Sequence, residues 1–322
     1  MSYSNVISRS NAEALIPEDV AKEIIKAAPE QSAVMQLGRR LPNMSRQQRR
    51  MPVLNSLITG GFVDGDTGLK QTSAADWQNK YLTAAEIAVI VPIPEAVLDD
   101  ADYNIWEEIK PQIAEEFGRI FDAAVLFGTD KPADWPDGLV QQATAKGHVV
   151  DLSTVEGGGG DLYDALLGAN GSLAKVEEDG FMVTGHVAAM SMKGKLRSLR
   201  DTSKQPIFMR GMQSSSRYEL DGEPIYFPKN GAIRSSDALV ISGDWNQLVW
   251  SIRQDLTYKV LDQAVITDAS GGIVYNLAQQ DMVALRAVMR VAWQLPNPAT
   301  ALNENESTRF PFAVLVEKGL LI

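Results

Sequence analysis

The chain has 322 residues, of which 45% are hydrophobic and 22% charged, so it can bury a sizeable core as one large or two modest domains. Its formal net charge of −11 argues against a protein whose main surface grips nucleic acid, because such proteins present a basic patch or stripe. The absence of cysteine excludes disulfides and thiolate metal sites, and no apolar run approaches about 18 residues, so no membrane span is expected.

Residues 1–45 predict a thin, polar arm with one short amphipathic helix. The helix is expected between Pro17 and Ala28, with Val20 and Ile24 on its apolar face. A proline at the first position of a helix is well tolerated, and Pro17 occupies that position here. The flanking residues are polar, so we expect this arm to need neighbours that hold it in place.

Residues 46–82 predict a long two-stranded hairpin. The stretch opens with a basic, glutamine-rich run that ends at Leu54, passes a glycine- and aspartate-rich tip at residues 60–68, and returns as an extended run over residues 81–91. The hairpin carries too few large apolar residues for a core of its own, and an isolated hairpin is at best marginally stable in water. We therefore expect it to lie on another surface, which need not belong to the same chain.

Residues 103–127 predict one long helix. Apolar side chains recur at spacings of three and four from Ile105 onward, and charged side chains occupy the other faces. Gly128 is placed to end the helix. Pro111 interrupts the pattern, so we expect a short first turn, a kink, and then a straight helix about 25 Å long.

The second half of the chain predicts alternating short elements followed by two late strands. The predicted elements are a helix at 161–174, a strand at 180–184, a helix at 186–199, a buried strand at 238–244, a long strand in the second half of 280–295 and a short strand at 312–316. This order predicts an α+β fold in which a central α/β lobe is inserted into a body of helix and strands.

Short motifs follow one another in a characteristic order along the chain. They lie at residues 61–63, 93–100, 127–128, 136–139, 198–201, 220–225 and 243–245, and Arg286 and Arg290 belong to the long late strand. Each motif is short, but their order and spacing together resemble the major capsid proteins of tailed double-stranded DNA bacteriophages. The resemblance covers nearly the whole chain.

The resemblance implies the phage major-capsid fold, divided into an N-terminal arm, an extended β-hairpin loop, a peripheral domain with a long spine helix, and an axial α/β domain. The implied boundaries are 1–45 for the arm, 46–82 for the loop, 83–132 with about 274–322 for the peripheral domain, and 133–273 for the axial domain. It further implies a structural protein that self-assembles into pentamers and hexamers of an icosahedral head enclosing double-stranded DNA.

The resemblance also implies partners and a location. The partners would be identical subunits, scaffolding and portal proteins and, where one exists, a decoration protein. Packaged DNA would be contacted only nonspecifically, and no membrane would be bound. The protein would reside in the virion after assembly in the host bacterial cytoplasm. Because the chain opens directly on the arm, we expect the scaffold to be a separate protein.

Two kinds of residue are candidates for contacts between copies. Aromatic side chains on the hairpin are candidates because aromatic residues are enriched at interfaces, although they could instead pack on their own body. Five arginines fall within twelve residues that contain no acid, which suits charge pairing across copies or, equally, a solvated surface. The predicted contact residues are Arg39, Arg40, Arg46, Arg49, Arg50, Phe62, Trp77 and Tyr81.

The sequence gives little support to an enzyme. It contains neither a G-x-S-x-G elbow nor a G-x-x-x-x-G-K-[ST] phosphate loop, and its only histidines are His148 and His186. Residues 64–75 resemble a calcium loop, but Ala75 stands where glutamate is required. We therefore predict no catalytic residue, cofactor or metal. Two alternatives remain open: the shell protein of a cellular nanocompartment with the same fold, and a soluble enzyme with an unrecognised site.

Overall fold

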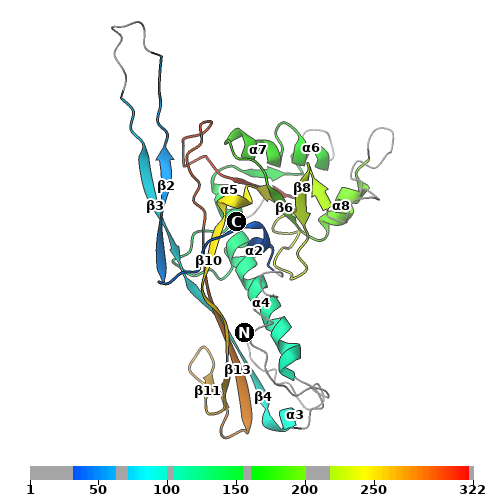
Figure 1. Cartoon of the computed structure of the whole chain (residues 1–322). Helices are drawn as coiled ribbons and strands as arrows, with labels where there is room; N and C mark the ends of the chain where they lie inside the picture. Colours follow the sequence, from blue (N-terminus) through cyan, green and yellow to red (C-terminus); the bar gives the residue numbers. More distant parts are fainter. Residues whose placement is uncertain (1–31, 63–71, 100–104, 155–160, 201–217, 319–322) are drawn as a thin grey trace.

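A computed structural model describes residues 32–62, 72–99, 105–154, 161–200 and 218–318 of the chain (Figure 1). A hairpin projects from an elongated body built around a long helix, and a mixed lobe lies beside the body. The helix predicted between Pro17 and Ala28 and the predicted glycine-aspartate tip from residue 63 onward lie outside the described residues.

The long helix is α4 (Ile105–Phe127), as the apolar periodicity predicts. Its apolar stripe is buried at Ile113, Phe117 and Phe121, which join one core with the strands beside it. The helix continues through Pro111 and ends at Gly128, whose φ of 68° and N–H bond to the Ala124 carbonyl form a glycine stop. α4 therefore lies at the centre of the main core.

A four-stranded sheet packs against α4 through the same core. Its order is β1 (Arg39–Arg40), β10 (Val249–Leu261), β13 (Met282–Gln294) and β4 (Ala85–Pro94), and only the first pair is parallel. α3 (Glu95–Asp99) follows β4. A separate small hairpin of β11 (Val265–Thr267) and β12 (Ile273–Asn276) lies at the far end of this sheet, where Leu277, Met282 and Ala284 form a second buried cluster.

The lobe is a mixed six-stranded sheet with short helices. The strands, in sheet order, are β5 (Val149–Asp151), β14 (Phe312–Val316), β9 (Val240–Gly243), β6 (Gly185–Ala188), β8 (Glu223–Tyr226) and β7 (Tyr218–Leu220). The helices are α5 (Leu139–Ala145), α6 (Leu162–Leu167), α7 (Ser172–Glu178) and α8 (Met192–Ser198). Every residue of β14, β9 and β6 is buried, as expected for central strands covered on both faces.

The lobe corrects two sequence-based expectations. The helix predicted at 161–174 is two helices, because the chain turns at Gly168, where a Cβ would lie only 2.5 Å from the Asp164 carbonyl oxygen. The predicted strand at 180–184 and helix at 186–199 are displaced: the strand is Gly185–Ala188 and the helix starts at Met192. His186 belongs to the strand because its ring bonds to Ser242 Oγ and the Leu220 carbonyl on neighbouring strands.

Two strands pair outside the domain ranges expected from the sequence. β10 lies within the range expected for the axial domain, yet it pairs with β13 in the four-stranded sheet. β14 lies within the range expected for the peripheral domain, yet it pairs with β5 and β9 in the lobe. The chain therefore crosses between the two sheets more often than a simple insertion of one lobe requires.

Substitution of Gly138 tests the close contact between the end of α4 and the start of α5. A Cβ at Gly138 would lie 2.3 Å from the Gly128 nitrogen, whereas a Cβ at Gly194 in α8 meets no heavy atom within 4 Å. We expect Gly138→Ala to destabilise the chain by about 1–3 kcal/mol through overpacking. Gly194→Ala should be neutral or stabilise by up to about 1 kcal/mol, because alanine favours helix. Thermal unfolding of both variants would measure this, and equal melting temperatures would contradict it.

Candidate functional site

The candidate site is the hairpin that projects from the body (Figure 1). β2 (Gln48–Ser56) pairs antiparallel with β3 (Asp76–Thr83), with Gln48 opposite Thr83 and Leu54 opposite Trp77. The structure corrects the extended run predicted at 81–91: the returning strand starts at Asp76, stops at Thr83, and β4 begins only at Ala85. The hairpin is a sheet of two strands among the described residues, so neither of its edges is paired with a further strand.

One face of the hairpin packs on the chain's own body. Residues at alternate positions share a face, which places Arg49, Val53 and Leu82 together. Leu82 and Val53 are buried, and Leu82 joins a small cluster that includes Met44. The Arg49 guanidinium donates to the carbonyls of Pro42 and Asn43 at 2.9 and 3.0 Å. This inner face therefore holds the lower part of the hairpin against the body.

The opposite face carries apolar side chains that nothing in the described chain covers. Trp77 faces Leu54 across the strands and is 63% exposed, and Tyr81 faces Arg50 and is 46% exposed. Phe62, nearer the tip, is completely exposed. Such a surface, together with free strand edges, is suited to binding another polypeptide rather than to chemistry.

The root of the hairpin is fixed to the core by one tryptophan N–H and one glutamine amide. Trp135 Nε1 donates to the Thr83 carbonyl at 2.9 Å, and Gln294 Nε2 donates to the Tyr81 carbonyl at 2.9 Å. The buried Trp135 ring meets Phe121 and Trp293 edge-on, with centroids 6.0 and 6.4 Å away. The root thus rests on the same core that packs around α4.

A connecting segment, residues 295–311, joins the hairpin to the lobe; we refer to it as the strap. On the hairpin side, the Ala299 N–H donates to the Leu54 carbonyl at 2.9 Å, and Lys80 Nζ lies 3.0 Å from Glu306 Oε1. On the lobe side, the Asp179 carboxylate accepts from Asn303 Nδ2 at 2.7 Å and from the Phe310 N–H at 2.6 Å. The strap therefore links the position of the hairpin to that of the lobe.

The structure divides the five predicted arginines into two groups. Arg40 lies over the Trp250 ring, 5.4 Å from its centroid, and bonds to the Asn43 side chain, so Arg40 and Arg49 meet at Asn43. Arg39, Arg46 and Arg50 are exposed, and the described part of the chain gives none of them an ion pair. The second group therefore differs from the first, because no contact within the described chain holds its guanidinium groups.

The sequence analysis missed several residues of this site. Ile58 is an exposed apolar residue between Trp77 and the tip, and Leu54 pairs with Trp77 on the outer face. The alternation of side chains along a strand is the signal that would have placed Leu54 on the face of Trp77. Glu306 and Gln294 carried no local signal, because their hairpin partners are more than two hundred residues away in the sequence.

Both histidines serve structural hydrogen bonds. Burial lowers the pKa of His186 to about 4, and its ring bonds to Ser242 and Leu220. His148 Nε2 lies 3.1 Å from Asp179 Oδ2, and burial lowers the pKa of His148 as well. Within the described ranges, no cluster of three or more acidic or histidine side chains is placed to hold a metal ion. The helices in those ranges are too short or too polar to cross a membrane.

Comparison with known proteins gives consistent matches over most of the chain. Residues 12–302 match the model of the Phage capsid family. The major capsid protein of Staphylococcus phage 80alpha is 27% identical over 300 residues, which is 89% of this chain and 84% of that protein. A solved structure from Microbacterium phage Oxtober96 is 37% identical, covers 97% of this chain and 99% of its own, and superposes with a TM-score of 0.76. One from Mycobacterium phage Cain is 32% identical, with coverages of 97% and 98% and a TM-score of 0.76.

The two faces of β3 should respond differently to truncation in the isolated chain. Leu82→Ala should destabilise by about 2–5 kcal/mol, because Leu82 is completely buried. Trp77→Ala should change the free energy of unfolding by less than about 0.5 kcal/mol, because exposed surface substitutions cost little. Urea unfolding of the isolated chain measures both, and a cost above about 1.5 kcal/mol for Trp77→Ala would mean that its face is covered within one chain.

Proposed function

Because the chain belongs to the phage capsid family, we propose that its copies form pentamers and hexamers by laying the hairpin of each copy on its neighbour. The chain is a structural shell protein of a phage, and its place is in the capsid of the virion. Its homologues are non-enzymatic proteins that build a shell from identical subunits. The observation that carries the proposal is the uncovered outer face of the hairpin at Trp77 and Tyr81.

The shape of the molecule supports a head-to-tail contact between copies. The hairpin projects from one end, and β11 lies at the other end (Figure 1). Exposed apolar residues also occur there, at Val260, Val265 and Ile273. Contacts between unlike surfaces of identical subunits form a ring when the rotation closes, which is the relation that pentamers and hexamers need.

The predicted contact residues take two roles in this proposal. Phe62, Trp77 and Tyr81 are buried by the neighbouring copy, because an exposed ribbon of aromatic side chains gains most from burial. Arg39, Arg46 and Arg50 pair with acids of the neighbour and guide its approach. Arg40 and Arg49 act from within the chain, because their contacts at Asn43 hold the base of the hairpin in position.

The four expected parts of the chain are retained in the proposal, with two changes that strand pairing supports. The arm at 1–45, the loop at 46–82, the peripheral domain at 83–132 with about 274–322, and the axial domain at 133–273 keep their outlines. β10 is assigned to the peripheral domain because it pairs with β13, and β14 to the axial domain because it pairs with β9.

The wider assembly follows from the same proposal. The shell is an icosahedral head that encloses double-stranded DNA, and its partners are scaffolding, portal and, where one exists, decoration proteins. Assembly takes place in the host bacterial cytoplasm. The net charge of −11 supports only nonspecific contact with the packaged DNA. The comparisons with phage proteins do not favour a nanocompartment shell or a soluble enzyme.

Removal of the outer aromatic side chains tests the hairpin contact. The double variant Trp77→Ala with Tyr81→Ala should fold normally and reduce the yield of closed particles at least about tenfold, because each lost contact recurs in every copy of the shell. The matched control is Tyr163→Ala, which removes an exposed aromatic side chain from α6 in the lobe. Electron microscopy and sedimentation count the particles; a normal yield from the double variant would refute the contact.

Charge reversal at Arg50 tests the electrostatic part of the proposal. Arg50→Glu should slow assembly several-fold at about 50 mM salt and much less at about 500 mM, because exposed charges are screened beyond a few ångströms in strong salt. Arg234→Glu makes the same charge change at an exposed arginine of the lobe and serves as the control. Light scattering follows the rates. If both variants slow assembly equally, the effect is one of net charge and not of pairing at Arg50.

A further inference from the structure

A buried carboxyl group joins the long helix to the first described segment of the chain. Asp122 of α4 has no solvent exposure. Its Oδ1 accepts from Ser32 Oγ at 2.6 Å and from the Val34 N–H at 3.1 Å. Its Oδ2 accepts from the Ala33 N–H at 3.0 Å and from Asn230 Nδ2 at 3.0 Å. One side chain therefore connects three segments that are far apart in the sequence.

The helix that Asp122 holds is too short to persist without support. α2 (Ala33–Leu37) has five residues, and isolated helices of that length are not stable in water. Ser32 caps it by accepting from the Met35 N–H, while Asp122 takes the N–H groups of the first two helical residues, which have no partner inside any helix. Docking of α2 thus depends on a residue of α4.

The docked helix sets the path of the chain toward the hairpin. Val34 and Met35 are buried in the main core. After Gly38, where a Cβ would lie 2.9 Å from the Leu248 side chain, the chain follows β10 through hydrogen bonds from the Leu41 and Met44 N–H groups. β2 begins four residues later. Release of α2 would therefore free residues 32–37, while residues 39–44 keep their hydrogen bonds to β10.

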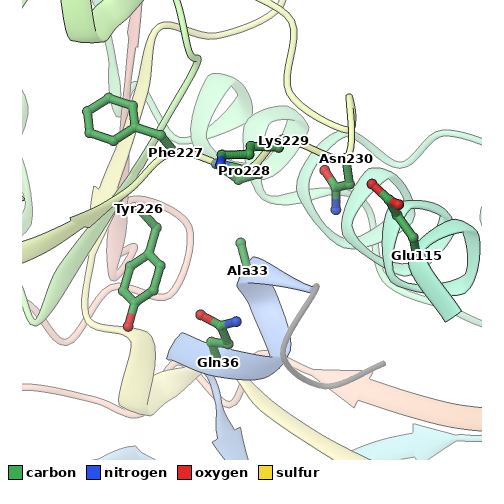
Figure 2. A pocket seen from close by; sticks show the side chains of 8 residues that line it. All are labelled: Ala33, Gln36, Glu115, Tyr226, Phe227, Pro228, Lys229 and Asn230. Carbon is green, nitrogen blue, oxygen red and sulfur yellow. The ribbon is translucent and has the colours of Figure 1, made fainter. Parts of the chain in front are cut away.

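Among the described residues, Asp122 has hydrogen-bond donors around it but no cation paired with it. α2 carries no charged residue. The charged groups nearest to Asp122 along α4 are Glu115 and the Glu116–Arg119 ion pair, and Lys110 lies nearer the start of the helix. The loop that carries Asn230 also carries Lys229, Arg234 and Asp237, and Tyr226 ends β8 just before it. Figure 2 shows Glu115, Lys229, Asn230 and Ala33 around a pocket of about 350 Å³ next to this junction.

Burial governs the protonation of this group. It raises the pKa of Asp122 from 3.8 to about 6, although the bonds from Ser32, Asn230 and the two backbone N–H groups act in the opposite direction. When α2 leaves α4, Asp122 meets water and regains its ordinary pKa. At pH values between these two pKa values, docking of α2 onto Asp122 is therefore accompanied by the uptake of a proton. The protonated carboxyl can donate to Ser32 Oγ, a hydroxyl that also accepts, so the cap survives protonation.

We propose that Asp122 is a proton-linked latch on the segment 32–37: the closed state is favoured most in acid, and α2 releases more readily as the pH rises toward neutrality. The extra stability of the closed state is complete below the ordinary pKa of an aspartate and is lost as the pH rises through about 6. The latch acts within one chain and does not rest on the hairpin contacts proposed between copies.

A single cysteine reports the opening directly, because the natural chain has none. Met35→Cys places a thiol on α2 at a buried position. Labelling by dithiodipyridine, expressed relative to the same thiol in the urea-unfolded chain at each pH, gives the open fraction of the full-length, unassembled chain. We expect this fraction to rise about tenfold between about pH 5 and about pH 7.5, as the two pKa values require.

Two further variants separate a proton-linked latch from a purely structural contact. Adding Asp122→Asn to the reporter removes the titrating group, so the rise with pH should vanish; an unchanged rise would overturn the proposal. Adding Ser32→Ala removes a bond that favours the charged form, so the midpoint of the rise should move to higher pH. The second variant keeps the test decisive if the first does not fold.

A second reporter identifies global unfolding. Ala313→Cys places the thiol in the fully buried strand β14, outside the latch. Global unfolding also exposes Asp122, so labelling at both reporters should rise with pH, but labelling of Ala313→Cys should be slower than that of Met35→Cys at every pH. Equal open fractions at the two reporters, or a fall at Met35→Cys with rising pH, would overturn the latch. Neither result bears on particle yield, so this test and that of the hairpin contact fail independently.

Discussion

A two-stranded hairpin cannot bury either of its faces by itself, so each face must be covered by another part of the chain or by another molecule. The inner face of the hairpin finds cover on its own body at Leu82 and Val53, but the outer face at Trp77 and Tyr81 finds none in the described chain. We propose that a second copy supplies the missing cover, because the capsid homologues build a shell from identical subunits. Under this proposal, incomplete burial in the single chain drives its association with other copies.

A projecting hairpin can make a specific contact only if its orientation is fixed. The chain fixes the orientation at two points along the hairpin. Trp135 and Gln294 bind the backbone of β3 near the root, on the same core as α4. Higher up, the strap binds Leu54 and Lys80 on one side and Asp179 of the lobe on the other. A change in the angle between the lobe and the body would therefore change the orientation of the hairpin.

The sequence predicted the elements that have a local apolar periodicity. It did not predict features that depend on residues far away in the chain. The stripe from Ile105 to Phe121 predicted α4, and the late apolar run predicted β13. His186 was assigned to a helix, because its partners Ser242 and Leu220 lie on strands that no local pattern connects to it. The same reason hid Glu306 as the partner of Lys80. Aromatic residues on the hairpin could be named, but their face required the register of β2 and β3.

The place of β14 has a consequence for the order in which the protein can form. β14 lies between β5 and β9, inside the six-stranded sheet, although it is the last strand described along the chain. During synthesis on a ribosome, the lobe cannot complete its sheet until residue 316 has emerged. Until the strap has also been made, the hairpin lacks the contacts that hold Leu54 and Lys80, so a shorter nascent chain fixes the hairpin only at its root.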